Sequence, residues 1–322
     1  MLLLTRSCTP KNNLSTTVTV TSHIKPQVSF GTQTPGSQTS QTEEPIIDNQ
    51  LVESNTQINL VPDPDTIISH IKSQINFGPR IPGSQGSLQT AKYIKNQLIE
   101  YGWDVVFQEF QFDGVLIRNI IAKNNDSRPK TIFGAHYDTR RYSDQEEVDS
   151  MKRIPVPGAN DGASGTALLI ELGRILSNSE ESFWLVFFDA EDQGYIEDWD
   201  WSVGADYFAQ HLEQSPDQVI VVDMIGDKDL NIFLEKNSDK DLCKAIWDSS
   251  QQLNYQDYFI LQEMYAMIDD HLPFLDRGIS ACLLIDFDYT YWHTNEDTVD
   301  KVSGKNISIV GEVLLNWISN FE

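Results

Sequence analysis

Basic residues are scarce in this chain of 322 residues. Lysine and arginine number 23 against 48 aspartates and glutamates, so the formal charge is −25. The shortage excludes a nucleic-acid backbone as partner and disfavours anionic membrane surfaces, because both need a basic protein surface. An acidic surface instead favours a cationic ligand, such as the α-ammonium group of a peptide.

Long apolar runs are missing as well. No stretch of about 18 apolar residues occurs in the sequence, and a membrane-spanning helix needs roughly that length, so we expect no transmembrane segment. Hydrophobic residues nevertheless make up 40% of the chain. That share suffices for the core of one large α/β domain or two small ones.

Cysteine is also rare. The chain has three, Cys8, Cys243 and Cys282, which are too few for a disulfide framework or a zinc cluster. Cys243 and Cys282 stand in apolar surroundings typical of regular elements. We therefore expect buried free thiols at these two positions, with one disulfide between them as the alternative.

Residues 1–60 have almost no hydrophobic periodicity. They are rich in Ser, Thr and Gln, and such a segment buries too little apolar surface to offset its ordering entropy, so we expect a disordered tail. The apolar run Leu2–Leu4 is too short for a signal peptide. If a longer signal precedes it, Cys8 would belong to a lipoprotein site, although Arg6 and Ser7 fit one poorly. The composition suits an exported protein tethered to an envelope, so we expect an extracytoplasmic location.

Residues 61–322 are expected to form a single domain. Strand-like apolar runs alternate with long helical patterns, which predicts an α/β fold with three layers, helix–sheet–helix, around a mixed, mostly parallel sheet. Two neighbouring early strands predict an antiparallel hairpin. The expected strands are Asp104–Phe112, Leu116–Lys123, Lys130–Ala135, Phe183–Asp189, Val219–Val222, Leu230–Leu234 and Ala281–Ile285. The main expected helices are the segment between Ser84 and Gly102, the segment from Asp161 to Leu176, Ser202–Leu212, Asp239–Leu253 and Gly304–Phe321.

A cluster of acids follows the most apolar of these strands. Asp189, Glu191 and Asp192 come directly after Phe183–Phe188, where open α/β sheets place their active sites. Buried acids are costly there unless a cation binds or protons are shared. The alternative is a solvated loop. As neighbours in an extended segment, Glu191 and Asp192 would point to different sides, so that one can bind metal while the other transfers protons.

Further imidazole and carboxylate groups stand at strand ends or helix starts. Each of them alone is compatible with a structural role, such as a buried histidine or a strand-end cap. Packing does not readily explain all of them together, and zinc takes these ligand types. The candidate ligands are His136, Asp161, Asp192, Asp223 and His293.

Six motifs follow one another in order along the domain. They are Ala135–Asp138, Gly158–Gly165, Phe188–Asp192, Val222–Gly226, Asp269–Leu275 and Trp292–Thr294. As an ordered set they resemble the zinc aminopeptidase and glutaminyl cyclase superfamily, over roughly residues 65–322. The resemblance implies a zinc exopeptidase-like fold and peptide or protein substrates with a free N-terminus.

The two branches of that superfamily imply different metal sites. Resemblance to the aminopeptidases implies two zinc ions, one held by Asp161, Asp192 and His293. The other would be held by His136 and Asp223, with Asp161 bridging the two. Resemblance to the cyclases implies a single zinc at the first of these sites.

Several residues favour the cyclase branch. There the resemblance implies an acidic proton network of Glu191, Asp223 and Asp269. Asp269 begins a double acid, as it does in cyclases, and Trp292 directly precedes the ligand histidine, where cyclases wall the substrate pocket with indole. The chain departs from animal cyclases at Asp192, where they have glutamate, and at Leu283, where they have histidine.

The resemblance implies a second pocket tryptophan after the acids Glu191 and Asp192. Both Trp199 and Trp201 stand near its position. We interpret the chain as a glutaminyl-peptide cyclotransferase that converts N-terminal glutamine to pyroglutamate and releases ammonia, with one zinc. The alternative is a two-zinc aminopeptidase. A non-catalytic binding domain is a third hypothesis, disfavoured because Glu191 and every candidate ligand are present. Fold alone does not separate these functions.

Overall fold

The computed structural model describes residues 61–321. The tail expected over residues 1–60 lies outside the described residues, and that prediction stays untested. Within residues 61–321, no helix is both long and apolar enough to cross a membrane.

Six strands form the central sheet, in the order β1-β2-β4-β3-β5-β8. The first two form the expected antiparallel hairpin, and β2 also runs antiparallel to β4. The other neighbours are parallel, so the predicted mixed, mostly parallel sheet is confirmed. The strands are β1 (Asp104–Phe112), β2 (Val115–Lys123), β3 (Thr131–His136), β4 (Phe183–Phe188), β5 (Gln218–Asp223) and β8 (Ser280–Ile285).

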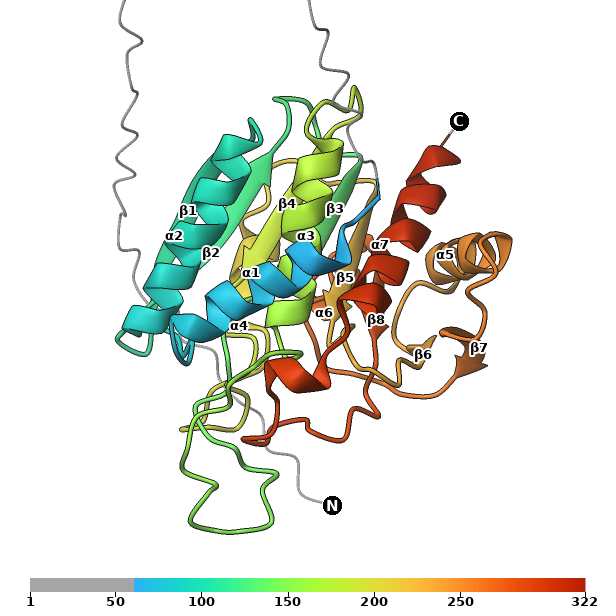
Figure 1. The fold of residues 1–322 in the computed structure, drawn as a ribbon. Helices are drawn as coiled ribbons and strands as arrows, with labels where there is room; N and C mark the ends of the chain where they lie inside the picture. The colour runs from blue at the N-terminus through green and yellow to red at the C-terminus, as the bar shows by residue number, and fades with distance from the viewer. Residues whose placement is uncertain (1–60, 322) are drawn as a thin grey trace, which may run out of the picture. The chain divides into compact units, whose positions relative to one another are not determined.

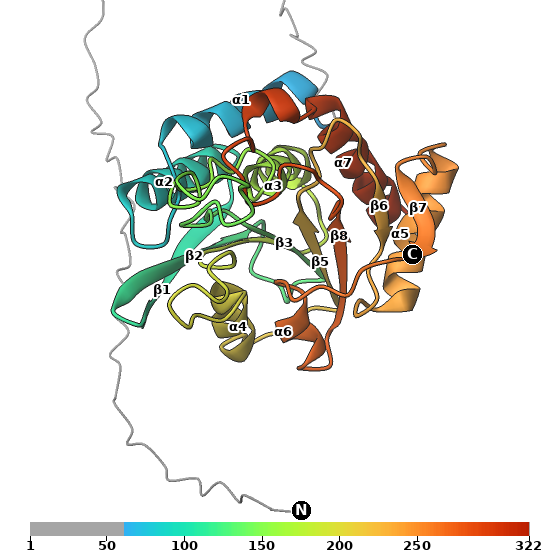
Figure 2. The same cartoon turned by 90° about the horizontal axis from the view of Figure 1, so that it is seen from below.

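Helices cover both faces of the sheet, which confirms the three layers (Figures 1 and 2). On one face lie α1 (Pro64–Asn76), α2 (Gln85–Glu100), α3 (Ala163–Leu176) and α7 (Gly304–Ser319). On the other lie α4 (Val203–Gln210) and α6 (Leu272–Leu275). Every residue of β3 and of β4 is buried, as expected for parallel strands covered on both faces.

Local signals set the helix ends where the sequence predicts them. Ser84 caps α2, because its side chain accepts a hydrogen bond from the backbone N–H of Ser87 at 3.1 Å. Gly102 follows the same helix with a φ of +92°, a left-handed conformation that favours glycine. The hairpin β1–β2 follows, so the first strand of the chain lies at one edge of the sheet.

A smaller unit lies beyond the β8 edge of the sheet (Figure 2). It contains α5 (Lys240–Gln252) and a parallel pair of short strands, β6 (Ile232–Leu234) and β7 (Phe259–Glu263). The sequence did not indicate β7, because only its first residue is buried and the run is short.

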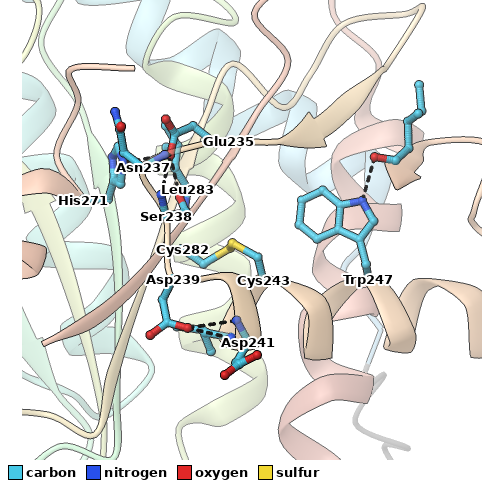
Figure 3. The surroundings of a disulfide bond; sticks show 12 residues. Glu235, Asn237, Ser238, Asp239, Asp241, Cys243, Trp247, His271, Cys282 and Leu283 are labelled. Carbon is cyan, nitrogen blue, oxygen red and sulfur yellow. Dashed lines mark hydrogen bonds and ion pairs between the residues drawn. A yellow bond between two sulfur atoms is a disulfide. The ribbon is translucent and has the colours of Figure 1, made fainter. Parts of the chain in front are cut away.

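A disulfide joins this unit to the sheet. Cys243 of α5 and Cys282 of β8 are bonded, with 5.5 Å between their Cα atoms (Figure 3). The expectation of free thiols is therefore wrong, because the fold brings two cysteines that are 39 positions apart to the spacing typical of disulfides.

Candidate active site

The candidate residues converge at one edge of the sheet. His136 is the last residue of β3 and Asp223 is the last of β5. Glu191 and Asp192 follow β4, and the segment after β8 carries His293. Because these four strands are parallel, their carboxyl ends share an edge, where open α/β sheets place their ligands.

The backbone turns sharply as it leaves this edge. Ala190 has a φ of +61° and His293 a φ of +54°. Left-handed backbone at a residue other than glycine costs on the order of 1–3 kcal/mol and is concentrated at functional sites. Glu191 lies in a bend and Asp192 in a turn, so the expected extended segment through these two residues is wrong, and both residues line one pocket.

Two groups of side chains could each hold a metal ion. In one, Asp161, Asp192 and His293 each offer a ligand atom, and these atoms all lie within 4.8 Å of one another. In the other, His136, Asp161 and Asp223 meet the same limit. Both predicted ligand sets are thus brought together, with Asp161 shared between them.

The first group fits a divalent cation well. His293 Nε2 lies 2.9 Å from Asp192 Oδ1, yet within residues 61–321 neither oxygen of Asp192 accepts a hydrogen bond. Burial, with the nearby Asp161 carboxylate, raises the pKa of Asp192 to about 6. A cation among these atoms would offset the cost of burying the carboxylates, and one imidazole with two carboxylates is a ligand set that zinc takes.

The second group is held together more tightly. His136 Nε2 lies 3.0 Å from Asp223 Oδ1 and 3.2 Å from Asp161 Oδ1. Burial would lower the pKa of His136, but Asp223, Asp138 and Asp161 outweigh it and raise the pKa well above its usual value. Either a proton on the imidazole or a metal ion can therefore balance the negative charge of the carboxylates in this group.

A pocket of about 240 Å³ adjoins both groups and contains the predicted acidic network. Glu191, Asp223 and Asp269 line it. Burial raises the pKa of Glu191 well above its usual value, and nearby carboxylates including Asp269 add to the shift while His136 opposes it. Burial and Asp223 raise the pKa of Asp269 to about 7. The pocket can hold protons near neutral pH.

Two of the three candidate tryptophans form the pocket wall. Trp201 and Trp292 line it, and both rings stack near His293, with ring centroids 6.1 and 3.8 Å from the imidazole. Trp199 does not line it. That side chain is buried in a separate apolar cluster and packs edge-on against Phe112 at 5.0 Å.

Two buried aspartates accept hydrogen bonds from the backbone that carries the candidate ligands. Asp138 accepts hydrogen bonds from the backbone N–H of Glu191 at 3.0 Å and of Asp192 at 3.3 Å. Asp297 accepts from the backbone N–H of Asp161 at 3.1 Å and from the Tyr289 hydroxyl at 2.7 Å. The role of Asp297 was missed, because nothing near it in the sequence marks a partner so far away.

An ion pair on the segment after β3 supports the first metal group. Asp144 Oδ1 lies 3.3 Å from His293 Nδ1, on the side of the imidazole away from Asp192. Arg140 donates to Asp144 and to the backbone carbonyl of Asp192 at 3.2 Å. A carboxylate on the far nitrogen of a ligand histidine fixes its ring orientation and tautomer. Nothing in the polar sequence of this segment marks Arg140 or Asp144 for this role.

Glu235 is another residue that the sequence did not indicate. Its carboxylate lies 3.2 Å from His271 Nε2 and accepts from the backbone N–H of Met267 at 2.8 Å. The same carboxylate accepts from the backbone and hydroxyl of Ser238 at 2.8 Å each (Figure 3). Because Met267 lines the pocket and His271 stands two positions after Asp269, Glu235 anchors that wall.

Comparison with known proteins places the chain in a family. Residues 119–318 match the model of peptidase family M28. The chain belongs to this family. The crystal structure of Porphyromonas gingivalis glutaminyl cyclase resembles it with a TM-score of 0.76 at 29% identity, over 80% of this chain and 98% of that chain.

Relatives of two activities occur among curated proteins. The glutaminyl-peptide cyclotransferase of Drosophila melanogaster is 26% identical over 252 residues, which cover 65% of this chain and 68% of the relative. Aminopeptidase YwaD of Bacillus subtilis (strain 168) is 24% identical over 220 residues, 61% of this chain and 43% of the relative. The match to YwaD thus covers less than half of that relative. The geometry of the site is therefore needed to distinguish between the two activities.

Proposed function

We propose that this protein is a glutaminyl-peptide cyclotransferase. It would convert an N-terminal glutamine to pyroglutamate and release ammonia. The observation that carries the proposal is the pocket beside the metal groups, whose lining combines Glu191 and Asp269 with the indoles of Trp201 and Trp292. Further support comes from the likeness to the P. gingivalis enzyme over nearly its whole length.

One zinc is the proposed cofactor, held by Asp161, Asp192 and His293. When bound, zinc supplies Lewis-acid polarisation of the carbonyl oxygen in the glutamine side chain. The Asp144 carboxylate faces the far nitrogen of the histidine at 3.3 Å, and Asp138 holds the turn that presents Asp192. The ligands are therefore oriented before substrate arrives.

Glu191 is the proposed proton carrier. The α-amine nitrogen forms a bond to the side-chain amide carbon, and the bond from that carbon to the amide nitrogen breaks. Glu191 accepts the proton from the attacking nitrogen and returns it to the departing one, which leaves as ammonia. No water is consumed, and the indoles of Trp201 and Trp292 keep water from the reacting carbon.

Asp269 and Asp223 would bind the nitrogen groups of the substrate. The α-amine arrives as a cation, and the strongly acidic chain favours its approach. With its pKa raised to about 7, Asp269 can accept a hydrogen bond from this cation and then take the proton that the nitrogen must lose before it attacks as a neutral amine. Asp223, at the end of β5, is a charged neighbour of Asp269.

One observation favours an aminopeptidase as the second candidate. The atoms of His136, Asp161 and Asp223 also lie within the spacing of a metal site. With two metals, a bound water would be the nucleophile and Glu191 its base.

The decisive experiment counts metal ions and follows the product. The zinc content per chain of the purified protein is measured. The protein is then incubated with a peptide that begins with glutamine, and the products are identified by mass spectrometry. One zinc and the loss of ammonia support the cyclotransferase. Two zinc ions and a released amino acid would replace it with the aminopeptidase.

We propose an extracytoplasmic location as well. Structural disulfides persist in oxidising compartments and are rare in the cytosol, and the Cys243–Cys282 bond lies in the core. Thiol trapping in intact cells, followed by mass analysis of the two cysteines, tests it. A fully reduced pair in the cell would contradict the proposal.

A further inference from the structure

A groove adjoins the catalytic pocket and shares one indole with it. It has a volume of about 410 Å³ and is lined by the end of β1, by Asp200 and Trp201, and by α4. Trp201 lines the catalytic pocket too. The two hollows therefore share this side chain as a wall.

The edge of the sheet runs along this groove. β1 is the outermost strand and, within residues 61–321, it pairs only with β2. Phe112 and Val115 flank a two-residue turn, so they form the hydrogen-bonded pair of the hairpin, and the next pair along the strands is not hydrogen-bonded. Gln111 consequently directs its backbone N–H and C=O away from β2, and it lines the groove.

The groove combines an aromatic wall with acidic groups. Phe110 of β1 stacks on Tyr207 of α4, with 3.8 Å between the ring centroids. The exposed carboxylates of Asp200 and Asp206 stand along the same groove. Among the described residues, no lysine or arginine lines it. This chemistry fits an extended peptide with cationic side chains, whose stems pack on the rings.

We propose that the groove binds the residues that follow the N-terminal glutamine of the substrate, and that it selects peptides with lysine or arginine there. The peptide extends along the free edge of β1, where main-chain hydrogen bonds give affinity and flanking side chains give specificity. Asp200 and Asp206 are the residues that discriminate. This inference rests on the proposed cyclotransferase activity, because the glutamine must occupy the neighbouring pocket.

The test compares three peptides: Gln-Ala-amide, Gln-Ala-Lys-Ala-Lys-amide and Gln-Ala-Glu-Ala-Glu-amide. The readout is the ratio of kcat/KM between the lysine and glutamate peptides, since a ratio within one protein cancels differences in folding or zinc content. At low ionic strength we expect the wild type to favour lysine roughly 3- to 10-fold, because exposed ion pairs contribute little individually. The preference should shrink in about 0.15 M salt.

Two double variants separate local from long-range charge effects. Asp200→Asn/Asp206→Asn should lose most of the preference. Glu180→Gln/Asp257→Asn removes the same charge from two exposed positions outside the groove and should keep it. Equal loss in both variants would assign the effect to the overall field of the protein and would overturn the proposal.

The outcomes also separate this inference from the proposed function. If the wild type cyclises Gln-Ala-amide but treats the two longer peptides alike, the groove proposal fails and the function stands. If it cyclises none of the three, the function fails. In that case, calorimetry measures the affinity of the wild type and of both double variants for the two longer peptides. The ratio of the affinities for the lysine and glutamate peptides then tests the groove proposal.

Discussion

Two adjacent carboxyl groups meet different surroundings at the end of β4. Asp192 faces His293 at 2.9 Å within a metal group. Glu191 belongs to neither metal group and lines the substrate pocket beside Asp269. In the proposed mechanism, this one turn, which Asp138 holds, would place the proton carrier next to a metal ligand.

Mutating these neighbours should separate the two roles. Glu191→Gln keeps the shape of the side chain, so zinc and fold should remain while turnover falls roughly 10²–10⁴-fold, the usual contribution of a proton carrier. Asp192→Asn removes an anionic ligand and should lower zinc occupancy itself. Metal analysis and an ammonia-release assay on both purified variants check this. Loss of zinc in Glu191→Gln with retention in Asp192→Asn would reverse the assignment.

Gly194 offers a test of the indole wall. A Cβ atom at this position would collide with the indole of Trp201, because the ring packs directly on the glycine. Gly194→Ala should therefore displace Trp201 and raise KM roughly tenfold, as loss of apolar contact in a pocket does. Zinc content should not change. An unaltered KM in a variant that binds zinc normally would show that Trp201 does not hold substrate.

At the scale of elements, the strand ends were predictable and the contacts between loops were not. His136 and Asp223 each end an apolar run, so the alternation of strands and helices was enough to place them. Glu235 follows β6, but its partners Met267 and His271 lie more than 30 positions further on. Their contact depends on pairing with β7, whose pattern in the sequence is weak.

The tryptophans show a similar limit. Trp199 and Trp201 are two positions apart in an irregular segment, where no period decides which side chain faces the pocket. Packing decides it, because Trp199 fills a cluster against Phe112. Likewise, the disulfide became evident only once α5 was placed against β8.

The Glu235 cluster predicts a pH-dependent contribution to stability. Burial raises the pKa of Glu235, but His271 and the backbone N–H groups of Met267 and Asn237 outweigh it and lower the pKa from 4.5 to about 2. The charged carboxylate therefore stabilises the fold above about pH 5, and this contribution is lost as the pH falls towards about 2.

Glu235→Gln should thus lower the free energy of unfolding by about 1–3 kcal/mol at neutral pH, because it leaves buried donors without an anionic acceptor. Its difference from the wild type should shrink as the pH falls. Denaturant titrations from pH 7 to pH 3 measure this, with Asp257→Asn as an exposed control. A difference that is constant with pH would contradict the charged state of Glu235.

At the scale of the whole molecule, a disulfide crosslinks the small unit to the central sheet. The disulfide closes a loop between positions 39 apart. Such a crosslink typically contributes about 2–4 kcal/mol, mainly by restricting the unfolded chain.

Cys243→Ser/Cys282→Ser should lower the melting temperature by about 5–10 °C. Zinc content should be retained, because neither cysteine belongs to a metal group. Calorimetric scans of the oxidised wild type and the variant measure the shift. An equal melting temperature would mean that packing between α5 and β8 alone holds the unit in place.

The closed loop also determines what happens to the chain after proteolytic cleavage. The segment between Cys243 and Cys282 includes β7, the pocket wall at Met267 and the acid Asp269. A protease that cuts once inside this segment produces two polypeptides that remain joined through sulfur. A nicked molecule can therefore retain all of its catalytic side chains, and cleavage would become visible only after reduction.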